Sequence, residues 1–381
     1  MIQEQAIDLP ALRQQIDRLD EQIVALYEKR MAIAEAVAEY KIATGKKVLD
    51  REREKEKLAA VKALTHNESN AYGATELFEQ IMAMSRKRQY RLLAQSDIRE
   101  KLPLTCVESL IIQGRKIVYQ GAEGAYSQEA MKRYFGADCD HFRVDTFRDA
   151  MVALAEQKAD YAVLPIENST AGVVGDIFDL LMEFDHCIVG EQIIKIEHCL
   201  MGLPGTKLAD ICQVFSHPQS LMQSAGYLRQ HPRWQQIGMQ NNAYAASKVQ
   251  ADGDKTQAAI ASAHAAQVYG LEILARGIHQ NSTNATRFII VSNRPEFVRS
   301  AGKISICFEV AHESGSLYHM LSHFIYNNLN MNRIESRPIA ERDWEYRFFI
   351  DFDGNLSDEA VINALTGLQE EALRLKILGN Y

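Results

Sequence analysis

The sequence has 381 residues, of which 47% are hydrophobic and 24% are charged, and its formal net charge is −8 at pH 7. This length allows two or three domains with separate cores, and the negative charge argues against general nucleic-acid binding. No segment approaches the roughly 20 apolar residues of a membrane-spanning helix. The N-terminus lacks a signal-peptide pattern, and six scattered cysteines without metal-ligand spacing predict a cytoplasmic protein without a metal.

Residues 11–44 contain neither glycine nor proline and predict one long helix. A helix of this length extends roughly 50 Å, too far for one small unit to bury its apolar face. We therefore expect an intertwined helical homodimer, followed by two shorter helices at about 51–65 and 73–95. The apolar stripe recurs at spacings of four and three: Leu12, Ile16, Leu19, Ile23, Leu26, Ile33, Val37 and Tyr40.

Charged residues interrupt or border this stripe. Arg30 occupies one of its apolar positions, where a charge is costly unless an anion or a hydrogen-bond network meets it. Lys41 lies near the same face, and Arg13 borders it. Taken singly, such residues are explained equally well by side chains that extend to water. Polar residues on the following helices add to the set: Asp50, Arg53, Glu54, Ser85 and Gln89.

The joint spacing of these eight residues resembles the all-helical chorismate mutases over about residues 8–92. Chorismate rearranges in one pericyclic step, so such a site orients the substrate and stabilises charge without a cofactor. The resemblance implies that Arg30, and Arg13 from the partner subunit, bind carboxylates. It also implies that Lys41 and Gln89 hydrogen-bond the ether oxygen. By the same resemblance, Glu54 would bind the ring hydroxyl, and the shell around the substrate would be completed by Asp50, Arg53 and Ser85.

The basic cluster at residues 86–88 and Arg91 lies beside Gln89. We interpret it as a solvated helix face rather than as a nucleic-acid patch.

Residues 114–294 alternate short apolar runs with helical patterns and predict α/β structure with a largely parallel sheet. A second strand–helix unit begins near Val214, which indicates two lobes with a cleft between them. The expected elements are strands at 117–121 and 161–167 and helices at 127–135, 147–157 and 172–184.

Polar residues follow the strands of this region at several junctions. Each alone is explained by helix capping, although a helix N-terminus also receives anions. Four ordered motifs together resemble the prephenate dehydratases over about residues 115–293: Gly121–Ser127, Pro165–Ser169, Ser216–Gln219 and Thr286–Phe288.

This second resemblance implies a two-lobed fold like that of periplasmic binding proteins, with the site in the cleft. It implies that Thr286 donates a proton to the departing hydroxyl of prephenate. The substrate would be positioned by Asn168, Ser169, Ser216 and Gln223. Arg287 is left with two interpretations, a carboxylate ligand or a support for its loop.

Residues 302–381 predict the ferredoxin-like order βαββαβ, with strands at 303–310, 329–336, 346–353 and 373–379 and helices at 315–327 and 357–372. Two short motifs within this order resemble the phenylalanine-binding ACT domain. Each alone is explained by a turn glycine or a strand-ending proline. The resemblance implies a regulatory phenylalanine site at Gly315, Ser316, Leu317, Glu335, Ser336 and Arg337.

The predicted domains are therefore a helical mutase at 1–95, a linker at 96–113, a dehydratase at 114–294 and a regulatory module at 302–381. The predicted protein converts chorismate through prephenate to phenylpyruvate, needs no cofactor, and is inhibited by phenylalanine. A solute-binding protein would carry a signal peptide, and a dehydrogenase fusion would need a nucleotide-binding G-x-G-x-x-G turn. Two alternatives stay open: arogenate as second substrate, and a mainly regulatory protein with one silent module.

Overall fold

The computed structural model describes residues 8–95, 103–281, 283–339 and 342–381. Its contacts divide the chain into two compact units. The first combines Met1–Leu102 with Cys307–Leu375, and the second combines Pro103–Ile306 with Lys376–Tyr381.

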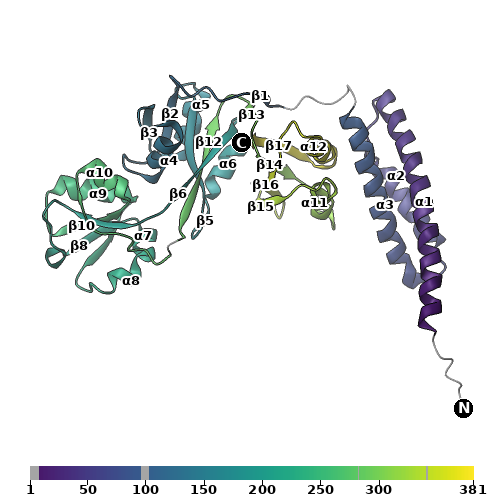
Figure 1. Ribbon diagram of the computed structural model, residues 1–381, viewed down its shortest axis with the longest axis horizontal. Helices are drawn as coiled ribbons and strands as arrows, with labels where there is room; N and C mark the ends of the chain where they lie inside the picture. Colours follow the sequence, from purple (N-terminus) through teal and green to yellow (C-terminus); the bar gives the residue numbers. More distant parts are fainter. Residues whose placement is uncertain (1–7, 96–102, 282, 340–341) are drawn as a thin grey trace, which may run out of the picture. The chain divides into compact units, whose positions relative to one another are not determined.

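The N-terminal region consists of three helices, α1 (Leu9–Thr44), α2 (Arg51–Leu64) and α3 (Glu68–Ala94). The side chain of Asp8 caps α1 at its start, and Gly45 ends it in the left-handed conformation. Helix α3 packs against both α1 and α2 (Figure 1). It begins five residues earlier than the sequence predicts, because Asn67 caps its first turn and Gly73 is tolerated inside it.

The apolar stripe of α1 is exposed in the single chain. Ile16 is 55% exposed and Ile33 is 67% exposed. The buried residues of α1 are instead Met31, Ala34 and Ala38, whose small or flexible side chains allow α3 to approach closely.

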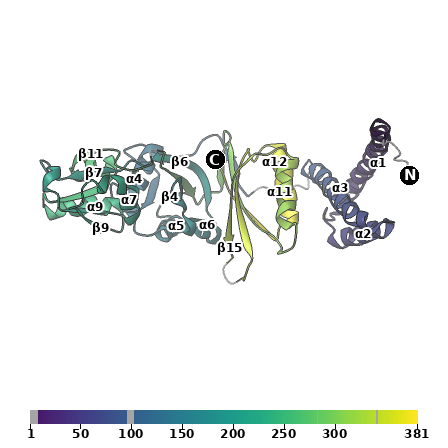
Figure 2. The same ribbon diagram turned by 90° about the horizontal axis from the view of Figure 1, so that it is seen from below.

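The C-terminal part of the chain, most of which belongs to the first unit, has the predicted βαββαβ order. The two helices cover one face of the sheet (Figure 2), and α12 also packs against α3 of the N-terminal helices. The strands follow the order β15-β16-β14-β17. The elements are β14 (Lys303–Glu309), α11 (Ser316–Tyr326), β15 (Met331–Pro338), β16 (Tyr346–Asp353), α12 (Glu359–Glu371) and β17 (Arg374–Asn380).

The second unit contains two large sheets, as the predicted two lobes require. The first has the order β6-β12-β4-β2-β3. Strand β2 is parallel to β3 and β4, whereas β12 is antiparallel to β4 and β6. Its elements are β2 (Lys116–Gln120), α4 (Tyr126–Phe135), β3 (Asp140–Val144), α5 (Phe147–Ala155), β4 (Tyr161–Asn168), α6 (Gly175–Glu183), β6 (Cys187–Lys195) and β12 (Ala285–Ser292).

The second sheet has the order β11-β7-β10-β8-β9, with β7 antiparallel to both of its neighbours. Because each sheet has antiparallel members, the prediction of a largely parallel sheet is wrong, and both sheets are mixed. The elements are β7 (Cys199–Gly202), η1 (Leu208–Asp210), β8 (Gln213–Ser216), α7 (Pro218–Gln223), α8 (Ala225–Leu228), β9 (Gln235–Gly238), α9 (Asn242–Asp252), β10 (Gln257–Ala261), α10 (Ala263–Tyr269) and β11 (Glu272–Ala275).

Several short strands occur where the sequence predicts none. Strand β1 (Thr105–Val107) lies within the predicted linker and pairs in parallel with β13 (Glu296–Val298). Strand β5 (Gly172–Val173) pairs with the end of β4, so that α6 starts at 175 rather than at 172. Linker residues 96–102 lie outside the described residues. In the part of the chain that is described, no helix has both the length and the hydrophobicity to cross a membrane.

Candidate active sites

A pocket in the N-terminal helices is lined by seven of the eight residues that the sequence assigns to chorismate. We call it the helical pocket. Helix α1 supplies Arg30 and Lys41, the start of α2 supplies three residues, and α3 supplies Ser85 and Gln89. The described residues that line it are Arg30, Lys41, Val48, Asp50, Arg53, Glu54, Lys57, Met82, Ser85, Arg86 and Gln89.

The anomalous arginine of the stripe has a hydrogen-bond network, as its position required. Arg30 Nη1 donates to Ser85 Oγ and, at 3.5 Å, to the carbonyl of Ile81. Ser85 Oγ in turn donates to the same carbonyl at 2.9 Å. Burial lowers the pKa of Arg30 from its very high ordinary value, but a guanidinium stays charged in proteins. A fixed cation therefore lines the pocket.

Lys41 provides a second cation. Its Nζ donates to the carbonyl of Val48 at 2.6 Å. Burial lowers its pKa, while the carboxylates of Asp50, Glu370 and Glu54 oppose this effect. The ammonium is thus held toward the connection between α1 and α2.

Gln89 is 7% exposed, and its Oε1 is buried without a hydrogen-bond partner among the described residues. A buried polar atom without a partner is costly, and a bound ligand is one way to satisfy it. Ser85 and Gln89 lie one turn apart on α3 and share a face, as predicted.

Asp50 and Arg53 also have purely structural contacts. The carboxylate of Asp50 caps α2 by accepting from Arg53 N at 3.0 Å. The Arg53 side chain is largely exposed and forms an ion pair of 3.1 Å with Glu56. Arg13, the eighth predicted residue, is exposed on α1 and does not line the helical pocket.

The interpretation of residues 86–88 as a solvated face is wrong for two of the three residues. Arg86 is 8% exposed and Lys87 is 7% exposed. Arg86 Nη1 donates to Glu54 at 2.5 Å, and its Nε donates to Glu371 at 3.0 Å. These two carboxylates outweigh the effect of burial and raise the pKa of Arg86. Sequence reasoning missed Arg86 because α12, which buries it, lies far away in the chain.

In the second unit, polar side chains meet at the paired ends of β4 and β12. Asn168 Nδ2 donates to Thr286 Oγ1 and to Asn284 Oδ1, each at 2.9 Å. The backbone register places Asn168 directly opposite Thr286. Asn168 Oδ1 accepts from the backbone of Thr170 at 3.0 Å and of Ala171 at 2.8 Å, which fixes the orientation of its amide.

This amide chain continues to the second sheet. Asn284 Nδ2 donates to Gln223 Oε1 at 3.2 Å, and Gln223 Oε1 also contacts His198 Nε2 at 2.8 Å. We call Asn168, Asn284, Thr286 and Gln223 the amide cluster. Burial lowers the pKa of His198, which favours the neutral imidazole.

Sequence reasoning included Asn168, Thr286 and Gln223 but missed Asn284 and His198. Asn284 is 2% exposed and lies two residues before Thr286. That proximity to a motif was the one available signal. His198 has no motif around it, and its place in the network depends on the fold.

The two predicted serines have different surroundings. Ser169 Oγ accepts from Ala285 N at 2.9 Å and joins the ends of β4 and β12 beside the amide cluster. Ser216 is fully buried at the end of β8, where its Oγ donates to the carbonyl of Ile260 at 2.7 Å. Both serines have backbone partners, as the capping interpretation also allows.

Arg287 does not join the amide cluster. Successive side chains of a strand point to opposite faces, so Arg287 and Thr286 diverge. The guanidinium of Arg287 forms ion pairs of 3.4 Å with Glu167 and 3.3 Å with Glu191. These contacts join β12 to both neighbouring strands.

The first dehydratase-like motif, Gly121–Ser127, packs against the second sheet's helices. Gly124 has φ of +78°, and a Cβ there would lie 3.0 Å from Ala265 Cα. Only glycine fits both the conformation and the approach. Ser262 Oγ donates to the Gly124 carbonyl at 3.3 Å, which joins this loop to α10.

The two predicted phenylalanine-site segments lie on different elements of the C-terminal module, one at the start of α11 and the other on β15. Gly315 precedes α11 with φ of +82°, and Ser316 and Leu317 line a pocket with Tyr346 and Phe348. The residues that the structure describes around that pocket do not include the second segment. That segment, Glu335, Ser336 and Arg337, lies on β15, the edge strand of its sheet.

Family models match two separate parts of the chain. The model described as chorismate mutase type II matches residues 12–90, and the model described as prephenate dehydratase matches residues 117–296. A bifunctional chorismate mutase/prephenate dehydratase of Aquifex aeolicus is 32% identical over 378 residues, which cover 98% of each chain.

Two solved structures resemble the part beyond the N-terminal helices. One is titled GqqA, a novel type of quorum quenching acylase; it is 34% identical with a TM-score of 0.65 and covers 70% of this chain and 97% of its own. The other is a prephenate dehydratase from Arthrobacter aurescens in complex with L-Phe, 29% identical with a TM-score of 0.64, covering 70% of this chain and 89% of its own.

Proposed function

The chain belongs to the family of bifunctional chorismate mutase/prephenate dehydratases and has both activities, and from this premise we propose which residues perform each reaction. The mutase is an isomerase that rearranges chorismate to prephenate. The dehydratase is a lyase that converts prephenate to phenylpyruvate, the precursor of phenylalanine.

Chorismate binds in the helical pocket. Arg30 binds a carboxylate, since its guanidinium offers a fixed pair of donors. Lys41 and the amide of Gln89 donate to the ether oxygen, where negative charge develops as the C–O bond breaks. Glu54 accepts from the ring hydroxyl, and Asp50, Arg53 and Ser85 complete the shell. The observation that carries this proposal is the convergence of two cations, Arg30 and Lys41, with the buried side chain of Gln89 on one pocket.

A second copy of the chain completes this site. The exposed apolar stripe of α1 supports a helical homodimer, because an apolar face of this extent is rarely left in water. Arg13 lies on α1 beside that stripe and outside its own helical pocket. We assign it to the pocket of the partner, where it binds the second carboxylate of chorismate.

Prephenate binds at the amide cluster, and Thr286 donates a proton to its departing hydroxyl. Because Thr286 Oγ1 accepts from Asn168 Nδ2, its own O–H proton is available to a ligand. As the C–O bond breaks, the C–C bond to the ring carboxylate also breaks, and its electron pair aromatises the ring. The reaction consumes one proton, which Thr286 passes to the departing hydroxyl and regains from solvent. The products are water, carbon dioxide and phenylpyruvate. Ser169, Ser216 and Gln223 keep the surrounding backbone and amides in place.

For Arg287, the ion pairs with Glu167 and Glu191 favour structural support over substrate binding. The charge of this guanidinium is already balanced by two carboxylates, so it attracts a third carboxylate only weakly. The substrate carboxylates are then bound by other groups, of which helix N-termini near the amide cluster are one class.

The C-terminal βαββαβ module is an ACT domain that binds phenylalanine and inhibits the enzyme. The related Arthrobacter structure, a complex with L-Phe, supports this assignment. Because the described residues that line the pocket at Ser316 and Leu317 do not include segment 335–337, we assign the ligand to an interface where each copy supplies one segment. The six cysteines are all free, which supports a reducing compartment, the cytoplasm.

One assay tests the proposal as a whole. Purified full-length protein receives chorismate, and the loss of chorismate and the gain of phenylpyruvate are followed with and without phenylalanine. We expect both reactions, each slowed by phenylalanine. Accumulation of prephenate without phenylpyruvate would contradict the dehydratase assignment, and preference for arogenate would identify the other substrate.

A further inference from the structure

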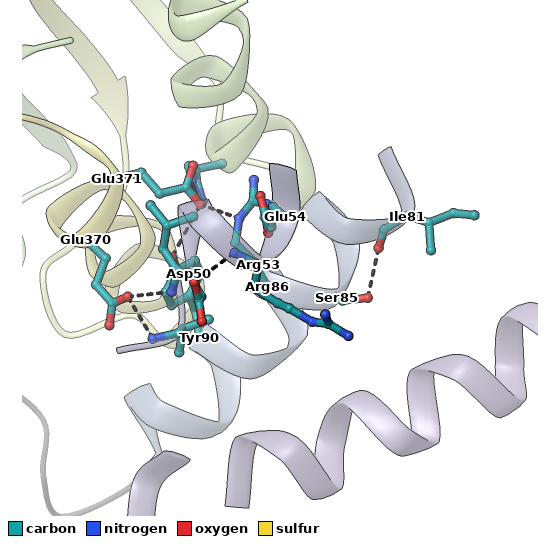
Figure 3. A network of polar contacts seen from close by, with 12 residues as sticks. Asp50, Arg53, Glu54, Ile81, Ser85, Arg86, Tyr90, Glu370 and Glu371 are labelled. Carbon is teal, nitrogen blue, oxygen red and sulfur yellow. Dashed lines mark hydrogen bonds and ion pairs between the residues drawn. The ribbon is translucent and has the colours of Figure 1, made fainter. Parts of the chain in front are cut away.

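Helix α12 ends with two adjacent carboxylates, Glu370 and Glu371, and each contacts the N-terminal region (Figure 3). The C-terminal end of a helix already concentrates negative charge, so carboxylates there are unfavourable unless cations or N–H groups compensate them. Arg51 supplies part of this compensation, because its Nη2 donates to the carbonyl of Glu371 at 3.2 Å.

Glu371 connects to the helical pocket through Arg86. Its side chain is 6% exposed, and it accepts from Arg86 Nε at 3.0 Å. The other end of the same guanidinium donates to Glu54 at 2.5 Å. Arg86 is therefore fixed between one carboxylate from α12 and one carboxylate that lines the pocket (Figure 3).

Other buried groups keep Glu371 ionised. His323 Nε2 lies 3.3 Å from its Oε1, and Tyr90 donates to the same oxygen at 3.4 Å. Burial alone would raise the pKa of Glu371, but His323 and Arg86 outweigh burial and lower it to about 2. The charge needed to hold Arg86 is thus present at neutral pH.

Glu370 connects to the pocket by a different route. Its Oε2 accepts from the backbone N–H groups of Val48 at 3.0 Å and Leu49 at 3.1 Å. The carbonyl of the same Val48 accepts from Lys41 Nζ at 2.6 Å. Glu370 therefore fixes the backbone at residues 48–49, and this backbone in turn holds the ammonium of Lys41.

The contact between α12 and α3 is closely fitted. A Cβ at Gly367 would lie 3.1 Å from the Tyr90 ring and would collide with the ring of His323. Such a close approach depends on glycine, and it sets the end of α12 at one position along α3.

We propose that Glu370 and Glu371 are positioning residues of the mutase site: Glu371 acts through Arg86 on Glu54, and Glu370 acts through the backbone at 48–49 on Lys41. The C-terminal module thereby completes the shell around a site on the N-terminal helices. This inference rests on the proposed roles of Glu54 and Lys41.

The two routes predict different kinetics in the full-length enzyme. Glu54 holds the ring hydroxyl in ground and transition states alike, so Glu371→Gln raises the KM for chorismate about tenfold and changes kcat less. Lys41 acts on charge that develops in the transition state, so Glu370→Gln lowers mutase kcat about tenfold with little change in KM. Dehydratase activity, measured on the same preparations with prephenate, stays within about twofold of the wild type.

Glu359→Gln is the control, because Glu359 is an exposed carboxylate on the same helix whose contact with the N-terminal region, at Gln95 Nε2, lies outside the helical pocket. A cycle with Arg86→Gln tests the route itself: Glu371→Gln should add no further rise in KM in that background. A KM for Glu371→Gln equal to that of the control would overturn the role of Glu371, and unchanged kcat for Glu370→Gln would overturn the role of Glu370.

Two further variants separate this inference from the site assignment. If Lys41→Ala and Glu54→Gln abolish mutase activity while both α12 variants behave like the control, only the positioning role fails. If Lys41→Ala and Glu54→Gln remain fully active, the helical pocket is not the mutase site, and the inference fails with it. Should Glu371→Gln also lose dehydratase activity through misfolding, the half-buried Glu370 still decides the question.

Discussion

The two sites that we propose for this enzyme are built from different chemical groups. The helical pocket is lined by charged side chains, among them Arg30, Lys41, Arg86 and Glu54. The amide cluster is built from neutral groups, with amides and one hydroxyl linked by hydrogen bonds of 2.9 to 3.2 Å.

The difference follows from the two reactions. A pericyclic rearrangement transfers no proton, so the catalyst acts through fixed charge and orientation. Loss of a hydroxyl needs a proton donor at a defined atom, and a hydroxyl oriented by an amide supplies one. Variants that affect one site and spare the other therefore test the comparison directly.

The largest expected effect is at Lys41. Lys41→Ala removes a donor to the developing charge and should lower mutase kcat by about a thousandfold. This is the upper end of the effect of removing a single hydrogen-bond donor. Dehydratase activity and dimer formation should be unchanged. Steady-state chorismate consumption measures the loss, with the exposed Lys47→Ala as control. Near-normal turnover would show that charge at this position is dispensable.

Thr286→Ala should affect only the second reaction. Removal of the proton donor should lower phenylpyruvate formation by at least about a hundredfold, while chorismate consumption continues and prephenate accumulates. Thr286→Ser retains the hydroxyl and should recover much of the activity. Loss of both activities in Thr286→Ala would indicate misfolding or a shared site.

Asn284→Ala should have an intermediate effect. It removes the link between Asn168 and Gln223, so we expect dehydratase kcat to fall about tenfold. This loss is smaller than the roughly hundredfold loss expected when the proton donor itself is removed. Mutase kinetics serve as the internal control. Wild-type dehydratase kinetics would show that the amide cluster needs no connection to the second sheet.

Arg287→Met separates structural support from substrate binding. It removes the cation that Glu167 and Glu191 share, although Glu191 keeps its ion pair of 2.5 Å with Lys303. We expect a loss of about 2 kcal/mol in the free energy of unfolding, which is below the range for fully buried pairs. The KM for prephenate should change less than about threefold, since carboxylate binding lies elsewhere. A large rise in KM with unchanged stability would instead make Arg287 a substrate ligand.

The smallest effect concerns pH. Because the pKa of Glu371 is lowered from 4.5 to about 2 in the folded protein, its contribution to stability is complete above pH 4.5 and disappears as the pH falls toward 2. The difference in unfolding free energy between wild type and Glu371→Gln should shrink over that window. A difference that persists at pH 2 would mean that the charge of Glu371 is not its source.

Local sequence patterns predicted most elements because helix periodicity and turn residues are local properties. Helix α1 is delimited by Pro10 and Gly45, and the βαββαβ order follows from alternating apolar runs. Strand β1 escaped prediction because it is three residues long and pairs with β13, about 190 residues later. Its pairing cannot be inferred from its own composition.

The site residues likewise divide into those with a local sequence signal and those whose surroundings depend on distant parts of the chain. Arg30 was detectable because a charge on an apolar stripe is a local anomaly. Arg86 was not, because a basic run looks solvated until a carboxylate from α12 buries it. Likewise the pairing of Arg287 with two glutamates depends on which strands flank β12.

The most direct test mixes the two inactive variants. Lys41→Ala retains only the dehydratase activity of the amide cluster, and Thr286→Ala retains only the mutase activity of the helical pocket. We predict that neither protein alone converts chorismate to phenylpyruvate at a useful rate, and that the mixture does so through free prephenate. Phenylpyruvate from either variant alone at the wild-type rate, or none from the mixture, would contradict two separate sites of different chemistry.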